Sequence, residues 1–228
     1  RGAAKGVKVQ VEFVSANPTG PLHVGHGRGA AYGASLSDVL AFAGYDVTRE
    51  YYVNDAGRQM DILALSTWLR YLAFFGIEIP FPPNAYQGDY VIDMGREMRD
   101  AHQDRFARVS AEQILAGTPG LPPADRKDDE AKQQREEHLD ALIANAKRLL
   151  GEDYPWVHGF ALNEQLGDGR EDLQEFGVRF DKWFSEQSLF DTGLVERAVE
   201  QLEKQGHIYV QDGAKWFRST AFGDEKDR

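Results

Sequence analysis

Two histidines lie three residues apart in a loop rich in glycine and proline. His23 and His26 are separated by Val24 and Gly25, and Gly27 follows them. At the start of a helix, free backbone amides and the positive end of the helix dipole favour a phosphate group. Two imidazoles at this spacing can donate hydrogen bonds to adjacent phosphate oxygens and stabilise charge as pyrophosphate departs. The pattern therefore predicts a nucleotide-binding loop.

The same residues allow two other interpretations of this loop. Residues 25–30, GHGRGA, satisfy the pattern G-x-G-x-x-A of dinucleotide-binding folds, in which Glu50 would bind a ribose hydroxyl. In that fingerprint the first glycine follows the strand directly, whereas about ten loop residues precede it here. This spacing argues against a nicotinamide or flavin cofactor. The other alternative is structural: the glycines permit close helix packing, and the histidines are surface residues.

The hydrophobic pattern predicts the elements that must position these histidines. Residues 7–14 alternate apolar and polar side chains with the period of a strand, and residues 15–27 form a loop. A helix of small residues is expected over 28–42 and a second strand over 47–53. Together these elements predict the first part of a doubly wound α/β sheet.

The central part of the chain has the composition of an inserted helical region. Apolar residues over 60–75 recur at helical spacing, which predicts a helix that lies on the sheet. Three prolines over 79–83 mark a boundary. Eleven of the sixteen residues over 125–140 are charged, so we expect this stretch to face solvent.

The last part of the chain returns to the pattern of a sheet. A buried strand is expected over 178–184, and a helix over 195–202 that Gly206 caps. Residues 207–220 read as a hairpin that turns through Asp212-Gly213. The expected divisions are a first catalytic part over 1–83, a charged helical insertion over 84–150, and a return to the sheet over 151–228.

Composition excludes several classes of protein. The net charge of −11, from 26 Lys+Arg and 37 Asp+Glu, would repel polyanions over the chain as a whole. Zero cysteines exclude disulfides, thiolate metal sites and a cysteine nucleophile. No apolar run reaches the length of a membrane span, so we expect a cytoplasmic protein without membrane contact. Four further histidines show no metal-ligand spacing and are expected to be structural or solvated: His102, His138, His158 and His207.

Three separated blocks resemble one enzyme family. The run ANPTGPLHVGH resembles the "HIGH" motif region of class I aminoacyl-tRNA synthetases, and EFVSANPTGPLHVGHGR with the later YYVNDAGRQ closely resembles the arginyl-tRNA synthetases. The resemblance resumes at FGVRFDKWFSEQSLFDTGL and continues to the end of the chain. It implies an α/β fold: the first half of a class I synthetase Rossmann-like nucleotide-binding fold, with a mostly helical insertion and a C-terminal helix-hairpin segment.

The resemblance also implies roles in binding ATP and the arginine side chain. His23 and His26 match the motif histidines that contact ATP and stabilise the transition state, and Gly25 matches the position that makes room for adenine. Glu12 and Glu186 match carboxylates that bind the guanidinium group. A guanidinium has five donors in a plane, so two acids from different segments suit it.

The resemblance places the α-amino and carboxylate end of arginine against the loop after the first strand. The matching positions there are Ser15, Ala16, Asn17 and His26. Neutral hydrogen-bonding groups suit a zwitterion, although serine and asparagine also occur in ordinary turns. A later block matches residues that line the cleft, without an assigned role: Asp55, Gly57 and Gln59.

The implied activity is ATP-dependent formation of arginyl-adenylate and transfer of arginine to tRNA(Arg), with Mg²⁺ accompanying ATP and a monomer as the acting form. The second catalytic loop, of the Lys-Ser-Lys type, and the helical anticodon-binding domain are absent from the sequence. We therefore expect a fragment that is inactive alone and meets tRNA mostly through other regions. Two alternatives stay open: another nucleotidyltransferase or ligase with the same histidine loop, and an inactive fragment that acts as a binding module.

Overall fold

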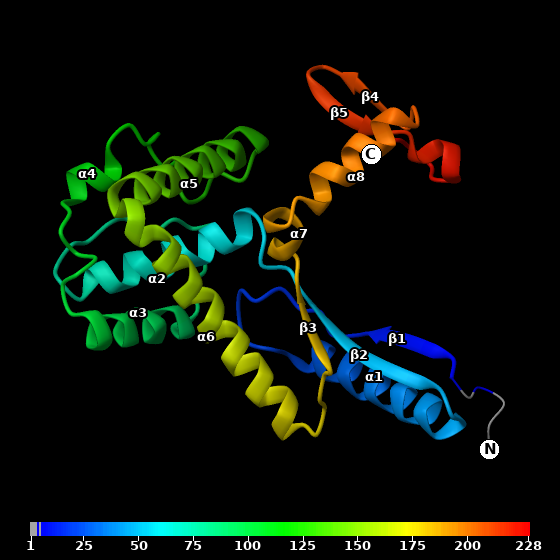
Figure 1. Cartoon of the computed structure of the whole chain (residues 1–228). Helices are drawn as coiled ribbons and strands as arrows, with labels where there is room; N and C mark the ends of the chain where they lie inside the picture. The colour runs from blue at the N-terminus through cyan, green and yellow to red at the C-terminus, as the bar shows by residue number, and fades with distance from the viewer. Residues whose placement is uncertain (1–3, 5) are drawn as a thin grey trace. The chain divides into compact units, whose positions relative to one another are not determined.

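The computed structural model describes residue 4 and residues 6–228, in two compact units that divide between Phe184 and Ser185. The elements that begin before that division are β1 (Lys8–Glu12), α1 (Val24–Ala43), β2 (Asp46–Val53), α2 (Arg58–Ala73), α3 (Asp89–His102), α4 (Ala111–Leu115), α5 (Asp129–Leu150), η1 (Gly151–Asp153), α6 (Tyr154–Glu175) and β3 (Lys182–Ser185), and Figure 1 labels the α-helices and strands among them. The elements after it are α7 (Gln187–Asp191), α8 (Leu194–Lys204), β4 (Ile208–Gln211), β5 (Ala214–Phe217) and η2 (Ser219–Phe222).

The sheet of the first unit has the order β1-β2-β3, so β2 is its central strand. β1 and β2 are parallel, with a register that runs from Lys8 beside Asp46 to Glu12 beside Glu50. α1 forms the crossover between them and lies along them in Figure 1. The predicted order of strand, loop, helix and strand is therefore confirmed, and the fold is α/β with a parallel three-stranded sheet.

Helix α1 starts at Val24 and not at Arg28, where the sequence pattern placed its start. The side chain of His23 caps the helix, so the glycines that follow it lie within the first turns of α1 and not in a loop. Farther along α1, Gly33 lets the helix pack closely against Phe13, the residue that follows β1. A methyl group there would lie 2.2 Å from Cγ of Phe13.

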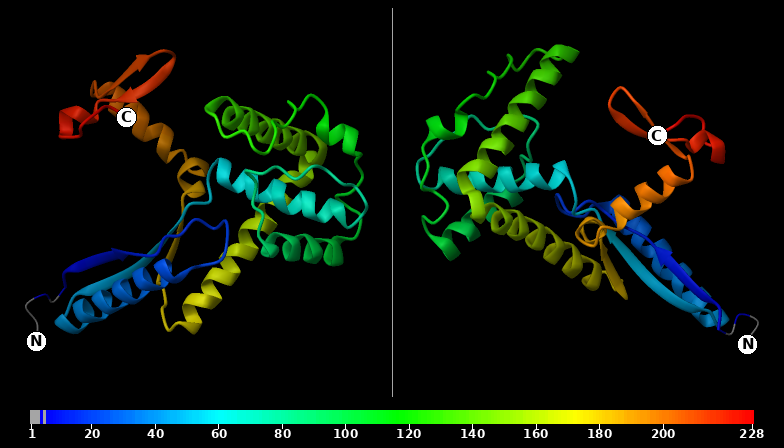
Figure 2. Two further views of the ribbon diagram at one scale, coloured as in Figure 1. Left: turned by 180° about the vertical axis from the view of Figure 1, so that it is seen from behind. Right: turned by 45° about the horizontal axis from the view of Figure 1, so that its top comes forward.

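Helix α2 packs among helices, which corrects the prediction that it lies on the sheet. Its largest contacts are with α3, α5 and α6, and Figure 2 shows these helices around it from two further sides. Trp68, Tyr71 and Leu72 are fully buried, together with Leu139 and Leu142 of α5. Because α2 is apolar around most of its circumference, it needs partners on several sides. The helices over 89–175 provide them.

The sheet has its own smaller apolar cluster. Tyr51 and Val53 of β2 pack with Leu173 of α6 and Val178. The carboxyl end of α6 therefore covers the strands, and its amino end belongs to the helical cluster. The sequence pattern did not predict α6, whose first turn contains Pro155. Within the described residues, no helix has the length and apolarity needed to cross a membrane.

The second unit contains the predicted helix and hairpin. Helix α8 ends beside Gly206, and β4 and β5 pair antiparallel. Asp212 and Gly213 both have positive φ, 53° and 78°. Positive φ at both central residues gives a two-residue turn a twist that matches the twist of the strands it joins. The sequence pattern did not predict the short helix α7, which starts this unit.

Candidate nucleotide and amino-acid site

His23 and His26 form a reciprocal cap at the start of α1. His23 Nδ1 accepts the backbone N–H of Gly25 at 3.1 Å, and His26 Nδ1 accepts the backbone N–H of His23 at 3.2 Å. The two rings stack, with centroids 3.7 Å apart. Two of the amide groups that a helix start leaves unpaired are thereby satisfied by imidazole nitrogens.

These bonds fix which nitrogen of each ring carries the proton. Since Nδ1 accepts in both His23 and His26, each neutral ring has its N–H at Nε2. Burial, followed by the charge of His23, lowers the pKa of His26 below 6.5. His26 is therefore neutral at pH 7, and its outward Nε2–H is a donor with a fixed direction.

Gly25 has a local structural role. A Cβ at this position would lie 2.9 Å from Cε1 and 3.0 Å from Nδ1 of His23, so a larger residue would displace the capping ring. At Gly27 an added Cβ meets nothing within 4 Å. The two glycines thus differ: Gly25 makes room for the histidine, and Gly27 leaves the helix surface open to a ligand.

The chain between β1 and α1 holds a strained backbone. Val14 and Ser15 both have positive φ, 67° and 42°, which costs a non-glycine residue about 1–3 kcal/mol. Ser15 Oγ donates to Glu12 Oε1 at 2.9 Å and accepts the backbone N–H of Tyr52 at 3.1 Å. Strain of this kind is found where a binding site needs a defined direction of the backbone. Here the strained residues Val14 and Ser15 follow the exposed Glu12 at the carboxyl end of β1 and fix the path of the chain beside it.

Ala16 and Asn17 are held by residues from the end of β2 and the start of α2. The hydroxyl of Tyr51 lies 3.1 Å from both the backbone N and the backbone O of Ala16. Burial raises the pKa of Tyr51, so the hydroxyl keeps its proton and can donate to the carbonyl. Asn17 contacts Asn54 and Gln59 through its side chain. Sequence reasoning missed Tyr51 and Asn54, although the carboxyl ends of parallel strands meet at one edge.

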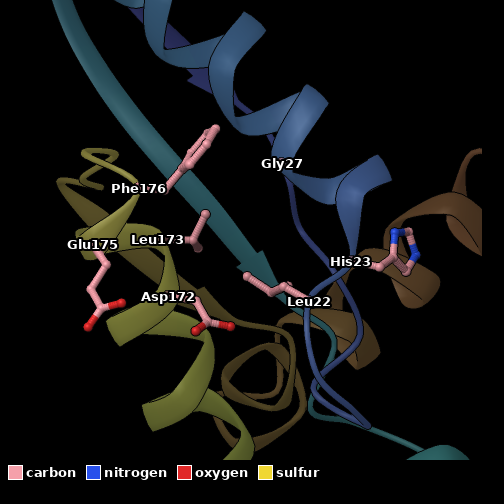
Figure 3. Close-up of a pocket in the computed structure, with 7 residues that line it drawn as sticks. All are labelled: Leu22, His23, Gly27, Asp172, Leu173, Glu175 and Phe176. Atoms are coloured by element: carbon pink, nitrogen blue, oxygen red, sulfur yellow. The ribbon is translucent and has the colours of Figure 1, made fainter.

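A pocket of about 390 Å³ opens beside His23, between the start of α1 and the end of α6 (Figure 3). Its lining residues are Leu22, His23, Gly27, Asp172, Leu173, Glu175 and Phe176. Two of these are acids, which disfavour a triphosphate. In Figure 3 the His23 ring points away from the side chains of Asp172 and Phe176. Phosphate contact is thus expected at the outer edges of the imidazoles and not in this pocket.

Glu50 does not fit the dinucleotide interpretation. Its side chain is buried, with Oε1 accepting from Gln10 Nε2 at 2.7 Å and Oε2 at 3.0 Å from Lys182 Nζ. A carboxylate with both oxygens in these contacts inside the sheet is not placed to bind a ribose. Glu50 instead connects β1, β2 and β3.

The remaining predicted residues fall into different parts of the structure. Glu186 is half-buried at the start of α7, in the second unit, whereas Glu12 belongs to the first. Asp55 is buried, and Gly57 has a φ of 99° at the turn into α2, a conformation that favours glycine. His138 is buried with Nδ1 2.6 Å from the carbonyl of Pro119, a structural contact. The described residues contain no group of three or more histidines and acids placed to hold a metal ion.

The comparisons with known proteins agree on one family. The model of the catalytic domain of class I tRNA synthetases (R) matches residues 2–71. The arginine-tRNA ligase of Azoarcus sp. (strain BH72) is 87% identical over 228 residues, covering 100% of this chain and 39% of the relative. That of Aromatoleum aromaticum is 81% identical with the same coverage. The chain thus spans about two fifths of the length of these relatives.

Solved structures give the same result for the fold. A Campylobacter jejuni protein provisionally identified as an arginyl-tRNA synthetase superimposes with a TM-score of 0.72 at 29% identity, covering 100% of this chain and 41% of that one. The Thermus thermophilus arginyl-tRNA synthetase gives a TM-score of 0.50 at 23% identity, covering 100% and 33%, and supports the fold alone.

Proposed function

We propose that this chain, which aligns over its full length with arginine-tRNA ligases and over residues 2–71 with the class I catalytic domain, supplies the first half of an active site that joins L-arginine to ATP and then to tRNA(Arg). Its sheet would be the first half of the class I Rossmann-like nucleotide-binding fold. The relatives are named arginine-tRNA ligases, and the whole chain aligns with them.

The observation that carries this proposal is the fixed pair of imidazoles at the start of α1. The N–H groups at Nε2 of His23 and His26 point outward, because both Nδ1 atoms are used in the helix cap. Each can donate to a phosphate oxygen of ATP and stabilise charge as the arginine carboxylate attacks the α-phosphorus and pyrophosphate leaves. The donors need no reorganisation during the reaction, since the cap already holds them.

Arginine would lie along the strained loop after β1. Glu12 is exposed there, and its bond from Ser15 leaves Oε2 for a guanidinium N–H. We propose Glu186 as the second carboxylate. The backbone of Ala16 and the side chains of Ser15, Asn17 and His26 would contact the amino-acid end, where neutral groups suit a zwitterion.

Mg²⁺ and tRNA belong to the same proposal. Within the part of the chain that the structure describes, no cluster of acids and histidines fits a metal ion, so we assign no protein site to Mg²⁺ and expect it to arrive with the ATP phosphates. With a net charge of −11, this chain is a poor surface for polyanions, so we expect tRNA(Arg) to bind mostly elsewhere in a protein of its relatives' length. The lack of cysteine agrees with a reducing cytoplasm.

The decisive experiment measures pyrophosphate exchange into ATP by the complete protein with L-arginine, lysine or citrulline. Citrulline keeps the shape of arginine and lacks its positive charge. We expect exchange only with arginine, a loss of several orders of magnitude in His26→Ala, and a selective loss of arginine affinity in Glu12→Gln. Exchange that depends on a different acid would favour another ligase that uses the same histidine loop. Specific arginine binding without any exchange would favour a binding module.

A further inference from the structure

Asn17 has its side-chain amide held from both sides. Asn54 Nδ2 donates to Asn17 Oδ1 at 3.0 Å, and Asn17 Nδ2 donates to Gln59 Oε1 at 2.9 Å. The three side chains come from different segments: Asn17 from the loop after β1, Asn54 from the position directly after β2, and Gln59 from the first turn of α2. The three amides therefore form one chain with a single direction, from Asn54 through Asn17 to Gln59.

This direction decides what Asn17 offers to a ligand. An amide can rotate by 180° and exchange its oxygen for its nitrogen with little change of shape. In Asn17 the rotated form would place N–H against the N–H of Asn54 and oxygen against the oxygen of Gln59. With the observed orientation, one N–H of Nδ2 and one lone pair of Oδ1 remain for a ligand.

The two residues that hold Asn17 are themselves firmly placed. Asn54 follows Val53, a buried residue of the central strand. Gln59 lies one residue before Met60, which is fully buried in the helical cluster, and Gly57 forms the turn between the two elements. The exposed amide of Asn17 is thus tied to two rigid elements, although it lies in a loop.

We propose that Asn54 and Gln59 are positioning residues that orient the Asn17 amide so that its free N–H meets the α-carboxylate of the amino-acid substrate. This inference rests on the proposed function, in which Asn17 contacts the amino-acid end of arginine. The donor holds the carboxylate for attack on ATP, and a rotated amide would present oxygen to it and repel it. Neither Asn54 nor Gln59 needs to touch the substrate.

Two substitutions of equal charge test the direction of the chain. Gln59→Glu keeps an acceptor for Asn17 Nδ2, whereas Asn54→Asp replaces the donor to Asn17 Oδ1 with an acceptor. Both place one carboxylate about one hydrogen bond from Asn17, so the electrostatic effect on the substrate is matched. We expect Asn54→Asp to raise KM for arginine about tenfold more than Gln59→Glu does, with KM for ATP unchanged in both.

A neutral variant supplies an independent measurement. Gln59→Met removes the acceptor without adding charge, and Gln59 is exposed, so folding is preserved. We expect its KM for arginine to rise about tenfold and its KM for ATP to stay at the wild-type value. Gln133→Met is the matched control, because Gln133 is an exposed helix residue whose amide also makes one side-chain hydrogen bond, to Glu137. It should leave both constants unchanged.

Pyrophosphate exchange by the complete protein distinguishes a failure of the proposed function from a failure of the positioning role of Asn54 and Gln59. If the wild type shows no arginine-dependent exchange, both the proposed function and this inference are overturned. If the wild type is active and Gln59→Glu and Asn54→Asp raise KM for arginine equally, Asn54 and Gln59 do not orient the Asn17 amide. The proposed function is unaffected by that result. The same conclusion follows if Gln59→Met changes the constants for arginine and ATP alike, since a merely structural role would do that.

Discussion

The imidazole rings of His23 and His26 lie nearly parallel, at 19° to one another, while each ring caps a backbone amide of the same helix turn. Stacking at 3.7 Å is compatible with two neutral rings and unfavourable for two charged ones. The pair is therefore a helix cap and a set of two donors at once, and its structure depends on pH.

The first prediction concerns this pH dependence. Burial and the neighbouring His23 lower the pKa of His26 in the folded chain, so the unfolded chain binds the proton more readily. The stability that the neutral ring contributes is present above pH 6.5 and is lost as pH falls through the lowered pKa. NMR titration of the His26 ring should give a midpoint below 6.5, and urea unfolding should show a loss of stability below that pH that is absent in His26→Gln. A midpoint above 6.5 would contradict the stacked geometry.

The second prediction separates capping from catalysis at His23. His23→Ala removes the acceptor of the Gly25 N–H and should destabilise the chain by about 1 kcal/mol. His23→Asn restores a capping side chain, so its free energy of unfolding should be close to that of the wild type. Since asparagine does not reproduce the outward imidazole N–H, pyrophosphate exchange by the complete protein should stay low in both variants. Recovery of exchange in His23→Asn would show that His23 acts only as a cap.

The third prediction concerns the contact of α1 with the loop after β1. Gly33→Ala places a methyl group 2.2 Å from Cγ of Phe13 and should destabilise the chain by roughly 1–3 kcal/mol. Gly29→Ala lies in the same helix, meets nothing within 4 Å, and should stabilise it by about 0.5–1 kcal/mol. Urea unfolding of the two variants measures both effects. Equal values would mean that Gly33 does not hold α1 close to Phe13.

The fourth prediction concerns an acidic contact between α3 and α6. Burial, then the hydrogen bond and charge of Glu97, then the charge of Asp168, raise the pKa of Glu164 to about 6. Stability from the protonated form is thus full below pH 4.5 and is lost as pH rises through about 6. Glu164→Gln should remove this loss and be more stable than the wild type at pH 7.5. Glu171→Gln, at an exposed position of the same helix, should keep the wild-type pH profile.

Much of the first unit could be predicted from local pattern. The alternation over 7–14 corresponds to β1 and the strand expected over 47–53 corresponds to β2, because a half-buried strand imposes a period of two. The position of α2 could not be predicted in the same way. Helical periodicity reports that a face is buried, but it does not tell whether a sheet or other helices cover it.

The site was predictable in its residue types and not in its contacts. The histidine motif indicated a phosphate-binding helix start, but an imidazole is an unusual cap, so the pattern placed the start of α1 four residues too late, at Arg28 and not Val24. The bonds of Asn17 to Asn54 and Gln59 join residues 37 and 42 positions apart. Only the parallel order of β1 and β2 brings them together, and no local signal encodes a pairing over that distance.

Arg58, the first residue of α2, donates to Asp140 at 2.7 Å and to Glu136 at 2.6 Å on α5. One peptide bond separates Arg58 from Gln59. A series of contacts therefore leads from Glu136 and Asp140 through Arg58 to its neighbour Gln59, whose side-chain amide holds Asn17. Glu136 and Asp140 belong to α5, yet through Arg58 they help to hold the helix turn that carries Gln59.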